Sequence, residues 1–418
     1  MVVRPTQEAV IREDIVALPG NVTYPIGFKA YGVHAGLRRK RLDMALLWSS
    51  RPATFSGMFT TNAAKAAPVR LTQQVAERGL SQALVVNSAN ANALTGKRGE
   101  ENARDMQQMV ARGLHVPPPF VAVASTGLIG VPLPMGSITR GVRDLIGLWS
   151  NLREETEADG VNASEAILTT DTMAKTGARL VRLSGGTVRI GMMVKGSGMV
   201  HPQMATILGF ITTDAEIAKP VWDDMIRHAV DRTFHRISVD GDVSTNDMVL
   251  GWANGMSGVA VENDHDCKIF GSALTELMRQ GARDIASDGE GATHLVTVVV
   301  TGAVTEADAA AKARAAVRSP LVKSAVYGRD PNWGRVVAAV GSAGVPFDPT
   351  RIDLSMNGMT LLQGGQPMAF NEERARAVMA LPEVIFVVNL HAGASSAEAW
   401  GCDLTERYVA INAQYRRS

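Results

Sequence analysis

The segment KGSGMVHPQMATILGFITTDA, residues 195–215, places one threonine, Thr206, where a glycine-rich loop meets an apolar run. A threonine hydroxyl is a weak nucleophile unless a base takes its proton, and the α-amine of an N-terminal threonine can be that base. Such an amine has a pKa of roughly 7.7 to 8.0, so part of it is unprotonated near neutral pH. This chemistry requires a cut between Ala205 and Thr206, which the hydroxyl could begin by attacking the preceding carbonyl in an N-to-O acyl shift. On the residues alone, an ordinary strand threonine is the alternative.

The elements around this threonine are predicted to be mixed strands and helices. The segments at 81–92, 120–130 and 294–304 are apolar runs that end in polar or glycine residues, as buried strands do, and 178–198 alternates around a Gly-Gly pair, which predicts a hairpin. Helical spacing marks 99–114, 220–237, 267–286 and 305–319, the last with Thr305 as its N-cap. We therefore expect an α/β (α+β) protein with layered sheets and helices. Its 418 residues suggest two lobes.

Composition excludes several classes of function. The formal net charge is +1 and the chain is 46% hydrophobic, so no overall field draws it to nucleic acid or anionic lipid. Its two cysteines form no CxxC pair, which argues against a disulfide framework or a zinc cluster. No signal-peptide core or membrane-length apolar run is visible. We expect a cytoplasmic protein that acts on small molecules, with no nucleic acid and no membrane as partner.

Other chemical motifs are incomplete. LTGKRGE at 94–100 lacks the first glycine and the final Ser/Thr of a phosphate loop, and the basic run LRRKR at 37–41 is predicted to be a solvated edge. No HExxH, no close histidine pair and no GxSxG elbow occurs, so we predict no metal and no serine-hydrolase site.

Six motifs in order resemble one family. KGSGMVHPQMATILGFITTDA, DGDVSTNDMVL, GRDPNWGRV, WGCDLTERYVAIN, TGLIG and TTDTMAK, together with the stretch from 27 to 69, are similar to the ornithine acetyltransferases, the bifunctional glutamate N-acetyltransferases of arginine biosynthesis. The resemblance runs from about residue 22 to 415. It implies self-cleavage between Ala205 and Thr206, giving an α chain (1–205) and a β chain (206–418) from one precursor. It also implies an α2β2 heterotetramer and a sandwich of sheets and helices like that of the N-terminal-nucleophile hydrolases.

The resemblance also implies a reaction. Thr206 would take the acetyl group of N-acetylornithine, release ornithine, and hold an acetyl ester until the amine of glutamate attacks it. Thr126 and Gly127, in the STG turn, would form the oxyanion hole. No bound cofactor is expected, and the sequence leaves open whether acetyl-CoA is a second donor.

Substrate contacts are implied for Thr172, Lys195, Thr206, Glu290 and Asn412. A lysine can pair with a substrate carboxylate, and Glu290 with an amine. The chain ends in NAQYRRS, so Ser418 takes the last contact only if the one-residue offset is tolerated; by count the position is Arg417.

Four motif residues receive no catalytic role: Asp242, Asp247, Arg329 and Asn332 either line the cleft or cap turns. Two other functions stay open on the sequence. One is a self-cleaving N-terminal-threonine amidohydrolase, which gives the threonine ester to water and so works without an acceptor amine. The other is a non-enzymatic binding or scaffold protein in which Thr206 is part of the core and the chain stays intact.

Overall fold

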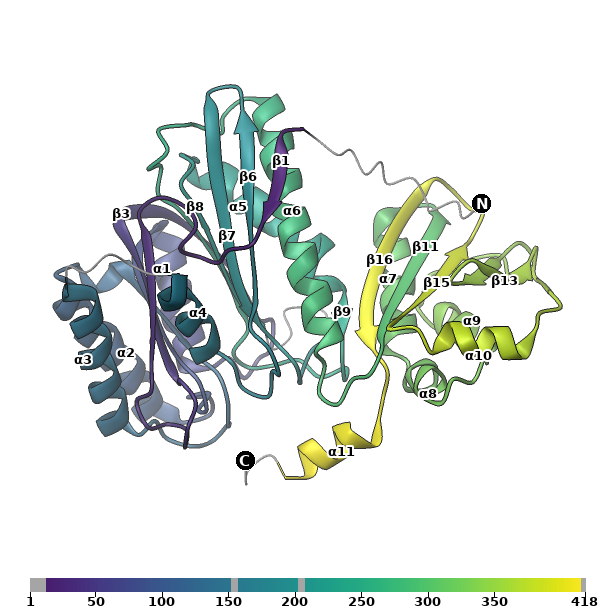
Figure 1. Cartoon of the computed structure of the whole chain (residues 1–418), viewed down its shortest axis with the longest axis horizontal. Helices are drawn as coiled ribbons and strands as arrows, with labels where there is room; N and C mark the ends of the chain where they lie inside the picture. The colour runs from purple at the N-terminus through teal and green to yellow at the C-terminus, as the bar shows by residue number, and fades with distance from the viewer. Residues whose placement is uncertain (1–12, 152–156, 202–206, 415–418) are drawn as a thin grey trace.

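The computed structural model describes residues 13–151, 157–201 and 207–414, and in them the strands form two sheets (Figure 1). In the first sheet the order is β1 (Ile15–Leu18), β6 (Lys175–Leu183), β7 (Gly186–Lys195), β8 (Leu208–Thr213), β10 (Met248–Ala253), β3 (Met44–Phe59), β4 (Leu80–Asn87) and β5 (Val121–Ser125), with β2 (Phe28–Val33) also paired to β3. In the second sheet the order is β14 (Gln366–Pro367), β13 (Met359–Gln363), β12 (Asp353–Met356), β15 (Glu383–Asn389), β11 (Leu295–Ala303), β16 (Ser395–Cys402) and β9 (Ile237–Ser238).

Helices cover these sheets. They are α1 (Ala67–Arg78), α2 (Gly96–Leu114), α3 (Met135–Ser150), α4 (Glu157–Ala166), α5 (Lys219–Arg232), α6 (Asp264–Ser287), α7 (Glu306–Arg318), α8 (Pro320–Gly328), α9 (Gly334–Gly341), α10 (Glu372–Met379) and α11 (Glu406–Ala413), with short 3-10 turns at Pro118–Phe120 and Phe234–Arg236. The mixed α/β, layered architecture predicted from the sequence is confirmed.

The predicted strands and hairpin form where the pattern placed them. The strand segments become β4, β5 and β11, and 178–198 folds into the antiparallel pair β6 and β7, whose ladder closes at Leu183 and Gly186. Their inner positions are almost all buried, because alternate side chains of a strand point to the same face.

The predicted helices also form. The Thr305 hydroxyl accepts a hydrogen bond of 3.1 Å from the Asp308 N–H and caps α7 as expected. Helix α6 begins at Asp264, three residues before the predicted start, because Asn263 caps it by accepting from the Asp266 N–H at 2.9 Å. The sequence did not predict this start, because the first turn of the helix is polar and shows no helical spacing of apolar residues.

The helices and the first sheet alternate in layers. Helices α2 and α3 pack on β3, β4 and β5 in one apolar cluster, and α5 and α6 pack on β6, β7 and β8 in another. A third cluster joins side chains of β4 and β5 to side chains of β7, β8 and β10, with α1 and α4 packed into it. The two halves of the sheet therefore share one core.

The second sheet has its own core with α7, α8, α9 and α10. Helix α6 runs between the two sheets and contacts β6 and β7 on one side and β9, β11 and β16 on the other (Figure 1). After β16 the chain returns through α11 toward the first sheet.

Strands from both sides of residue 205 belong to the first sheet. β8 pairs with β7 in antiparallel fashion and with β10 in parallel fashion, with Leu208 opposite both Lys195 and Met248. The predicted division into 1–205 and 206–418 thus does not follow the division into two sheets, and it stays a prediction about the processed chains.

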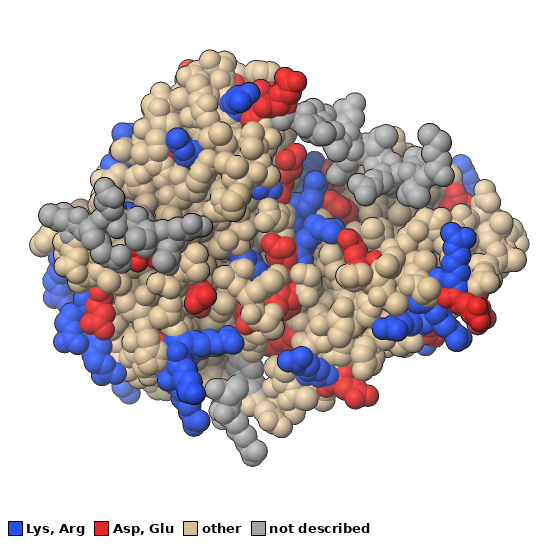
Figure 2. All heavy atoms as spheres, viewed as in Figure 1, with Lys and Arg blue, Asp and Glu red and all other residues tan. Residues whose placement is uncertain are grey.

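The charge distribution agrees with the net charge of +1. On the face drawn in Figure 2, basic and acidic side chains are intermixed and separated by large uncharged areas. Within the described residues, no helix combines the length and the apolar character needed to cross a membrane.

Candidate active site

A cavity of about 270 Å³ lies where the two halves of the chain meet. Its walls come from the turn after β5, the TTDT segment, the loop after β7, the loop before β10, the α6–β11 connection and α11. The lining residues are Ala91, Thr126, Gly127, Leu128, Ile129, Thr169, Thr170, Gly198, Met199, Ser244, Thr245, Asn246, Glu290 and Asn412. Four residues predicted from the family resemblance, namely Thr126, Gly127, Glu290 and Asn412, are therefore brought together from distant parts of the sequence.

The STG turn offers two donors to this cavity. The Thr126 N–H is already used, since it donates to the Asn87 carbonyl at 3.0 Å. The Thr126 hydroxyl has no partner in the described part of the chain, and the Gly127 N–H makes no well-aligned hydrogen bond there. A hydroxyl and a backbone N–H on adjacent residues can stabilise the oxygen of a tetrahedral intermediate.

Only glycine fits at position 127. Its φ is +133°, and a Cβ there would lie 2.2 Å from the carbonyl carbon of Ala89 and 2.5 Å from the nitrogen of Asn90. The facing loop is itself strained, because Ala89, Asn92 and Leu94 all have positive φ. The close approach of two backbones fixes the direction of the Gly127 N–H.

Glu290 and Asn412 form the opposite part of the wall. The Asn412 amide donates to Glu290 Oε2 at 2.7 Å, and the Glu290 N–H donates to the Ser197 carbonyl at 2.9 Å. A Cβ on Gly198 would lie 2.4 Å from the Glu290 carboxyl carbon, so glycine is needed for this contact. Glu290 is 6% exposed and lines the cavity, where its carboxylate can pair with an amine.

Lys195 lies behind the cavity wall. It is buried, and its ammonium donates to the hydroxyl of Thr169, a lining residue, at 2.7 Å and lies 3.7 Å from Asp171 Oδ2. Burial lowers the pKa of Lys195, while Asp171 opposes that effect. The ammonium group of Lys195 therefore lies directly behind Thr169, which lines the cavity.

The neighbouring carboxylates form a buried network with a second lysine. Lys175 Nζ lies 2.8 Å from Asp171 Oδ1 and 2.6 Å from Asp288 Oδ2. Burial alone would raise the pKa of Asp171, but Lys195 and Lys175 outweigh it and hold that pKa below its ordinary value. The Thr172 hydroxyl bonds to Asp288, and Thr172 is outside the lining of the cavity, whereas its neighbours Thr169 and Thr170 line it.

The residue before β8 is hydrogen-bonded to the loop that forms one wall of the cavity. Ile207 donates its N–H to Asp247 Oδ1 at 3.1 Å, and Asn246, next to Asp247, lines the cavity. The Asn246 amide donates to the carbonyls of Ala91 at 2.6 Å and Ser125 at 2.9 Å, so it ties the loop before β10 to the STG turn.

Several predicted site residues lie outside the described residues. These are Ala205 and Thr206 at the expected cut, and Arg417 and Ser418 at the chain end. Ile207 is the described residue that directly follows the expected nucleophile in the sequence.

Comparison with known proteins identifies the family. A model of the ArgJ family matches residues 29–417. The chain belongs to the ArgJ family. Two relatives, each named arginine biosynthesis bifunctional protein ArgJ, come from Symbiobacterium thermophilum and Oceanobacillus iheyensis. The first is 47% identical over 96% of this chain and 99% of its own length, and the second is 42% identical over 97% and 98%.

Two solved structures are also similar in sequence. The crystal structure of ArgJ from Bacillus halodurans is 42% identical, with a TM-score of 0.47, and covers 49% of this chain and 97% of that chain. An ornithine acetyltransferase from Mycobacterium tuberculosis, solved with ornithine, is 34% identical, with a TM-score of 0.42, and covers 46% of this chain and 100% of that chain.

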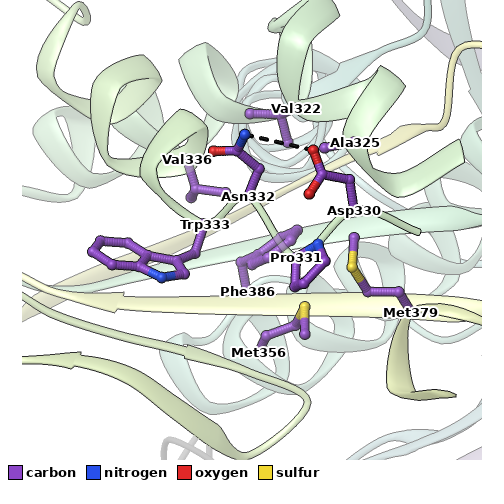
Figure 3. Close-up of a pocket in the computed structure, with 10 residues that line it drawn as sticks. All are labelled: Val322, Ala325, Asp330, Pro331, Asn332, Trp333, Val336, Met356, Met379 and Phe386. Atoms are coloured by element: carbon purple, nitrogen blue, oxygen red, sulfur yellow. Dashed lines mark hydrogen bonds between the residues drawn. The ribbon is translucent and has the colours of Figure 1, made fainter. Parts of the chain in front are cut away.

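The four motif residues to which the sequence assigned no catalytic role in this ArgJ family chain lie in surroundings that differ from one another. Asp242 is exposed, whereas Asp247 is fully buried, accepts the Ile207 N–H and does not line the cavity. Arg329 ends α8 with a φ of +52°, and Asn332 donates to the Asp330 carboxylate at 3.5 Å (Figure 3). Both belong to the second sheet's lobe, where the labelled side chains of Figure 3 enclose only about 10 Å³, too little for a substrate.

The prediction for LRRKR was wrong in part. Arg39, Lys40 and Arg41 are exposed, but Arg38 donates to the Thr169 carbonyl at 2.5 Å and Arg41 to the Asp171 carbonyl at 3.4 Å. These two arginines therefore hold the TTDT segment that lines the cavity. Spacing could not reveal this, because the contacts span about 130 residues.

The described residues contain no group of three or more His, Cys, Asp or Glu side chains arranged to hold a metal ion. The polar groups of the cavity are hydroxyls, amides, one carboxylate and a lysine behind the wall. Such groups can pair with the charged ends of an amino acid and can stabilise an oxyanion.

Proposed function

We propose that this chain is a glutamate N-acetyltransferase of arginine biosynthesis that moves the acetyl group of N-acetylornithine to glutamate through an acetyl ester on Thr206. Membership of the ArgJ family and the names of the relatives support acetyl transfer in this pathway. The observation that carries the residue assignments is the convergence of Thr126, Gly127, Glu290 and Asn412 on one cavity. A wall of that cavity belongs to the loop that binds the Ile207 N–H.

The first half-reaction forms the ester. Thr206 Oγ attacks the acetyl carbonyl carbon, and the α-amine of the new N-terminus takes the hydroxyl proton. The carbonyl oxygen becomes an oxyanion next to the Thr126 hydroxyl and the Gly127 N–H. As the C–N bond breaks, the proton passes from the α-ammonium to the departing nitrogen, and ornithine leaves as the free amine, which solvent then protonates.

The second half-reaction reverses this order. The amine of glutamate attacks the ester carbonyl, the same two donors stabilise the oxyanion, and the threonine oxygen leaves and regains its proton. Glu290 lies where it can pair with an ammonium group of ornithine, and Lys195 supplies positive charge behind Thr169 for a substrate carboxylate. No cofactor is required by this scheme.

The processed form would contain an α chain (1–205) and a β chain (206–418), assembled as α2β2. The pairing of β8 with β7 supports a stable complex of the two chains, because the cut would fall between neighbouring strands of one sheet. Molecular mass by light scattering tests the α2β2 assembly.

The decisive experiment combines gels with a donor test. The purified wild-type chain should give two bands on SDS gels, while Thr206→Ala should stay one band of 44.5 kDa and lose transfer. Enzyme, glutamate and N-acetylornithine should yield N-acetylglutamate, and a parallel assay with acetyl-CoA as sole donor decides whether it is a second donor.

Three outcomes would contradict the proposal. A wild-type chain that never cleaves would remove the N-terminal base. Release of acetate from N-acetylornithine at the same rate with and without glutamate would indicate an amidohydrolase. A Thr206→Ala variant that changed only stability would indicate a non-enzymatic protein.

A further inference from the structure

Asn246 is a buried asparagine of the cavity wall to which the reaction scheme above gives no role. It is 3% exposed, and its side-chain amide donates to the Ala91 carbonyl at 2.6 Å and to the Ser125 carbonyl at 2.9 Å. Its Oδ1 accepts the Thr245 hydroxyl at 2.6 Å. An asparagine amide has two hydrogens to donate, so both are used by two separate backbone segments.

One of these bonds fixes the peptide group that precedes the STG turn's glycine by one residue. The Ser125 carbonyl and the Thr126 N–H belong to the same peptide group. Asn246 donates to the carbonyl, and the N–H donates to the Asn87 carbonyl at 3.0 Å. A peptide group is planar and rigid, so holding both of its ends fixes the orientation of its plane. The next peptide group along the chain carries the Gly127 N–H, one of the two proposed oxyanion donors.

The other bond holds the loop that faces Gly127. The Ala91 N–H donates to the Leu128 carbonyl at 2.9 Å, and the Leu128 N–H donates to the Ala89 carbonyl at 3.1 Å. A Cβ at position 127 would lie 2.2 Å from the Ala89 carbonyl carbon, so the loop and the turn approach each other closely at this residue. Asn246 therefore bridges the two backbone segments that enclose the Gly127 peptide group.

The backbone of Asn246 is itself held on both sides. The Thr60 hydroxyl donates to the Ser244 carbonyl at 2.7 Å, and the Thr60 N–H donates to the Asp247 carbonyl at 3.0 Å. A side chain positions a catalytic group well only when its own support is rigid. The Asn246 amide has such a support.

We propose that Asn246 is a positioning residue for the oxyanion hole: by holding the carbonyls of Ala91 and Ser125, it fixes the orientation of the peptide group that carries the Gly127 N–H. The inference rests on the proposed function, because it assumes that the Thr126–Gly127 turn stabilises the oxyanion. A donor of this kind acts on the charge of the transition state, so the loss of Asn246 should lower kcat and leave substrate binding intact.

Asn246→Asp tests the proposal with almost no change in shape. One of its carboxylate oxygens would face both carbonyls without a hydrogen to donate, so the bridge is lost. The kcat per cut chain, counted on SDS gels, should fall about 10- to 10²-fold, the effect of displacing a catalytic group by about 1 Å. KM for N-acetylornithine and for glutamate should stay within about twofold of wild type. A raised KM with unchanged kcat would indicate a direct substrate contact and overturn the inference.

The matched control is Asn254→Asp, just beyond the other end of β10. Asn254 is 2% exposed, and its amide donates to the Ile26 carbonyl at 3.0 Å and to the Ser49 hydroxyl at 3.4 Å. Both substitutions therefore remove buried amide hydrogen bonds, and both variants should unfold at a lower urea concentration than the wild type. Only Asn246→Asp should lose kcat. Equal losses in the two variants would show a general effect of destabilisation and overturn the inference.

A double variant separates a role through Gly127 from an independent one. Asn246→Asp combined with Gly127→Ala should be within about threefold of the slower single variant, because both changes act on the same donor. Losses of kcat that multiply would overturn the inference.

The first half-reaction gives an independent measurement. Exchange of labelled ornithine into N-acetylornithine without glutamate reports that half-reaction alone. The same turn serves both half-reactions, so Asn246→Asp should slow the exchange by the same factor as the complete reaction. An unchanged exchange rate would place the effect on glutamate and overturn the inference.

The outcomes also separate this inference from the proposed function. If Asn246→Asp gives no folded, cut enzyme, Asn246→Ala, which adds no charge, is measured in the same way. If neither does while Asn254→Asp does, Asn246 is a folding determinant and the inference is overturned. Wild-type kcat in the Asn246 variants would overturn only the role of Asn246, whereas a wild-type enzyme without transfer activity would overturn both.

Discussion

Replacing Gly127 by alanine is the sharpest test of the proposed oxyanion hole. The new Cβ would lie 2.2 Å from the Ala89 carbonyl carbon and 2.4 Å from its oxygen, both backbone atoms that cannot rotate away. One of the two backbones must therefore move by about 1 Å, since non-bonded carbon atoms prefer about 3.5 Å or more. The movement also breaks the bond of 3.1 Å from the Leu128 N–H to the Ala89 carbonyl.

The size of the effect follows from these contacts. A strained backbone position costs about 1 to 3 kcal/mol, which should appear as a lower free energy of unfolding. Misdirecting one oxyanion donor should lower kcat about 10²- to 10³-fold. KM should change little, because the donor acts mainly on the charge that develops in the transition state.

The matched control is Gly130→Ala in the same segment. Gly130 also has a positive φ, of +78°, but a Cβ there meets no atom within 4 Å. Gly130→Ala should lower the free energy of unfolding but leave kcat unchanged. Steady-state formation of N-acetylglutamate and chemical unfolding are measured on both variants, with cleavage checked on gels. A cleaved Gly127→Ala enzyme whose kcat stays within about threefold of wild type would refute the placement of the oxyanion hole.

Two further substitutions probe the cavity wall and the network behind it. Asn412→Ala removes the hydrogen bond to Glu290 and should raise KM for the amino-acid substrates about tenfold, from about 1.5 kcal/mol; Gln414→Ala is the control, and equal KM values for both variants would exclude a substrate role. Lys175→Met leaves two buried carboxylates without their shared cation and should lower the free energy of unfolding by about 3 to 5 kcal/mol. The exposed Lys97→Met should change it by less than about 1 kcal/mol; similar urea midpoints for the two would contradict the buried network.

Local patterns predicted most elements because their causes are local. Thr305 caps α7 through a residue three positions away, and the Gly-Gly pair turns the hairpin between its own strands. The start of α6 was missed because Asn263 and Asp264 are polar and carry no apolar period.

Fewer of the site residues could be predicted from the sequence pattern alone. Glu290 and Asn412 were named only through the family resemblance, and no local signal joins positions 122 residues apart. Asp247 and Asn246 stood in a recognised motif, but their partners are distant in sequence: Asp247 binds Ile207, and Asn246 binds the carbonyls of Ala91 and Ser125. Arg38 was assigned to solvent because a basic run usually is exposed, and its bond to Thr169 could not be read from spacing.

The loop before the expected cut has a consequence for how the two chains can be made. Met199 and Val200 donate their N–H groups to Asp240, and the Ser197 hydroxyl donates to the Asp288 carbonyl, so the end of the proposed α chain is held by residues of the proposed β chain. In the uncut chain only a short connection separates β7 from β8, and their pairing forms as a local contact. Two chains expressed from separate genes would instead have to associate from solution, and the loss of translational and rotational entropy would oppose that association. Synthesis as one polypeptide would therefore assemble the two parts, and the proposed cut would follow without separating them.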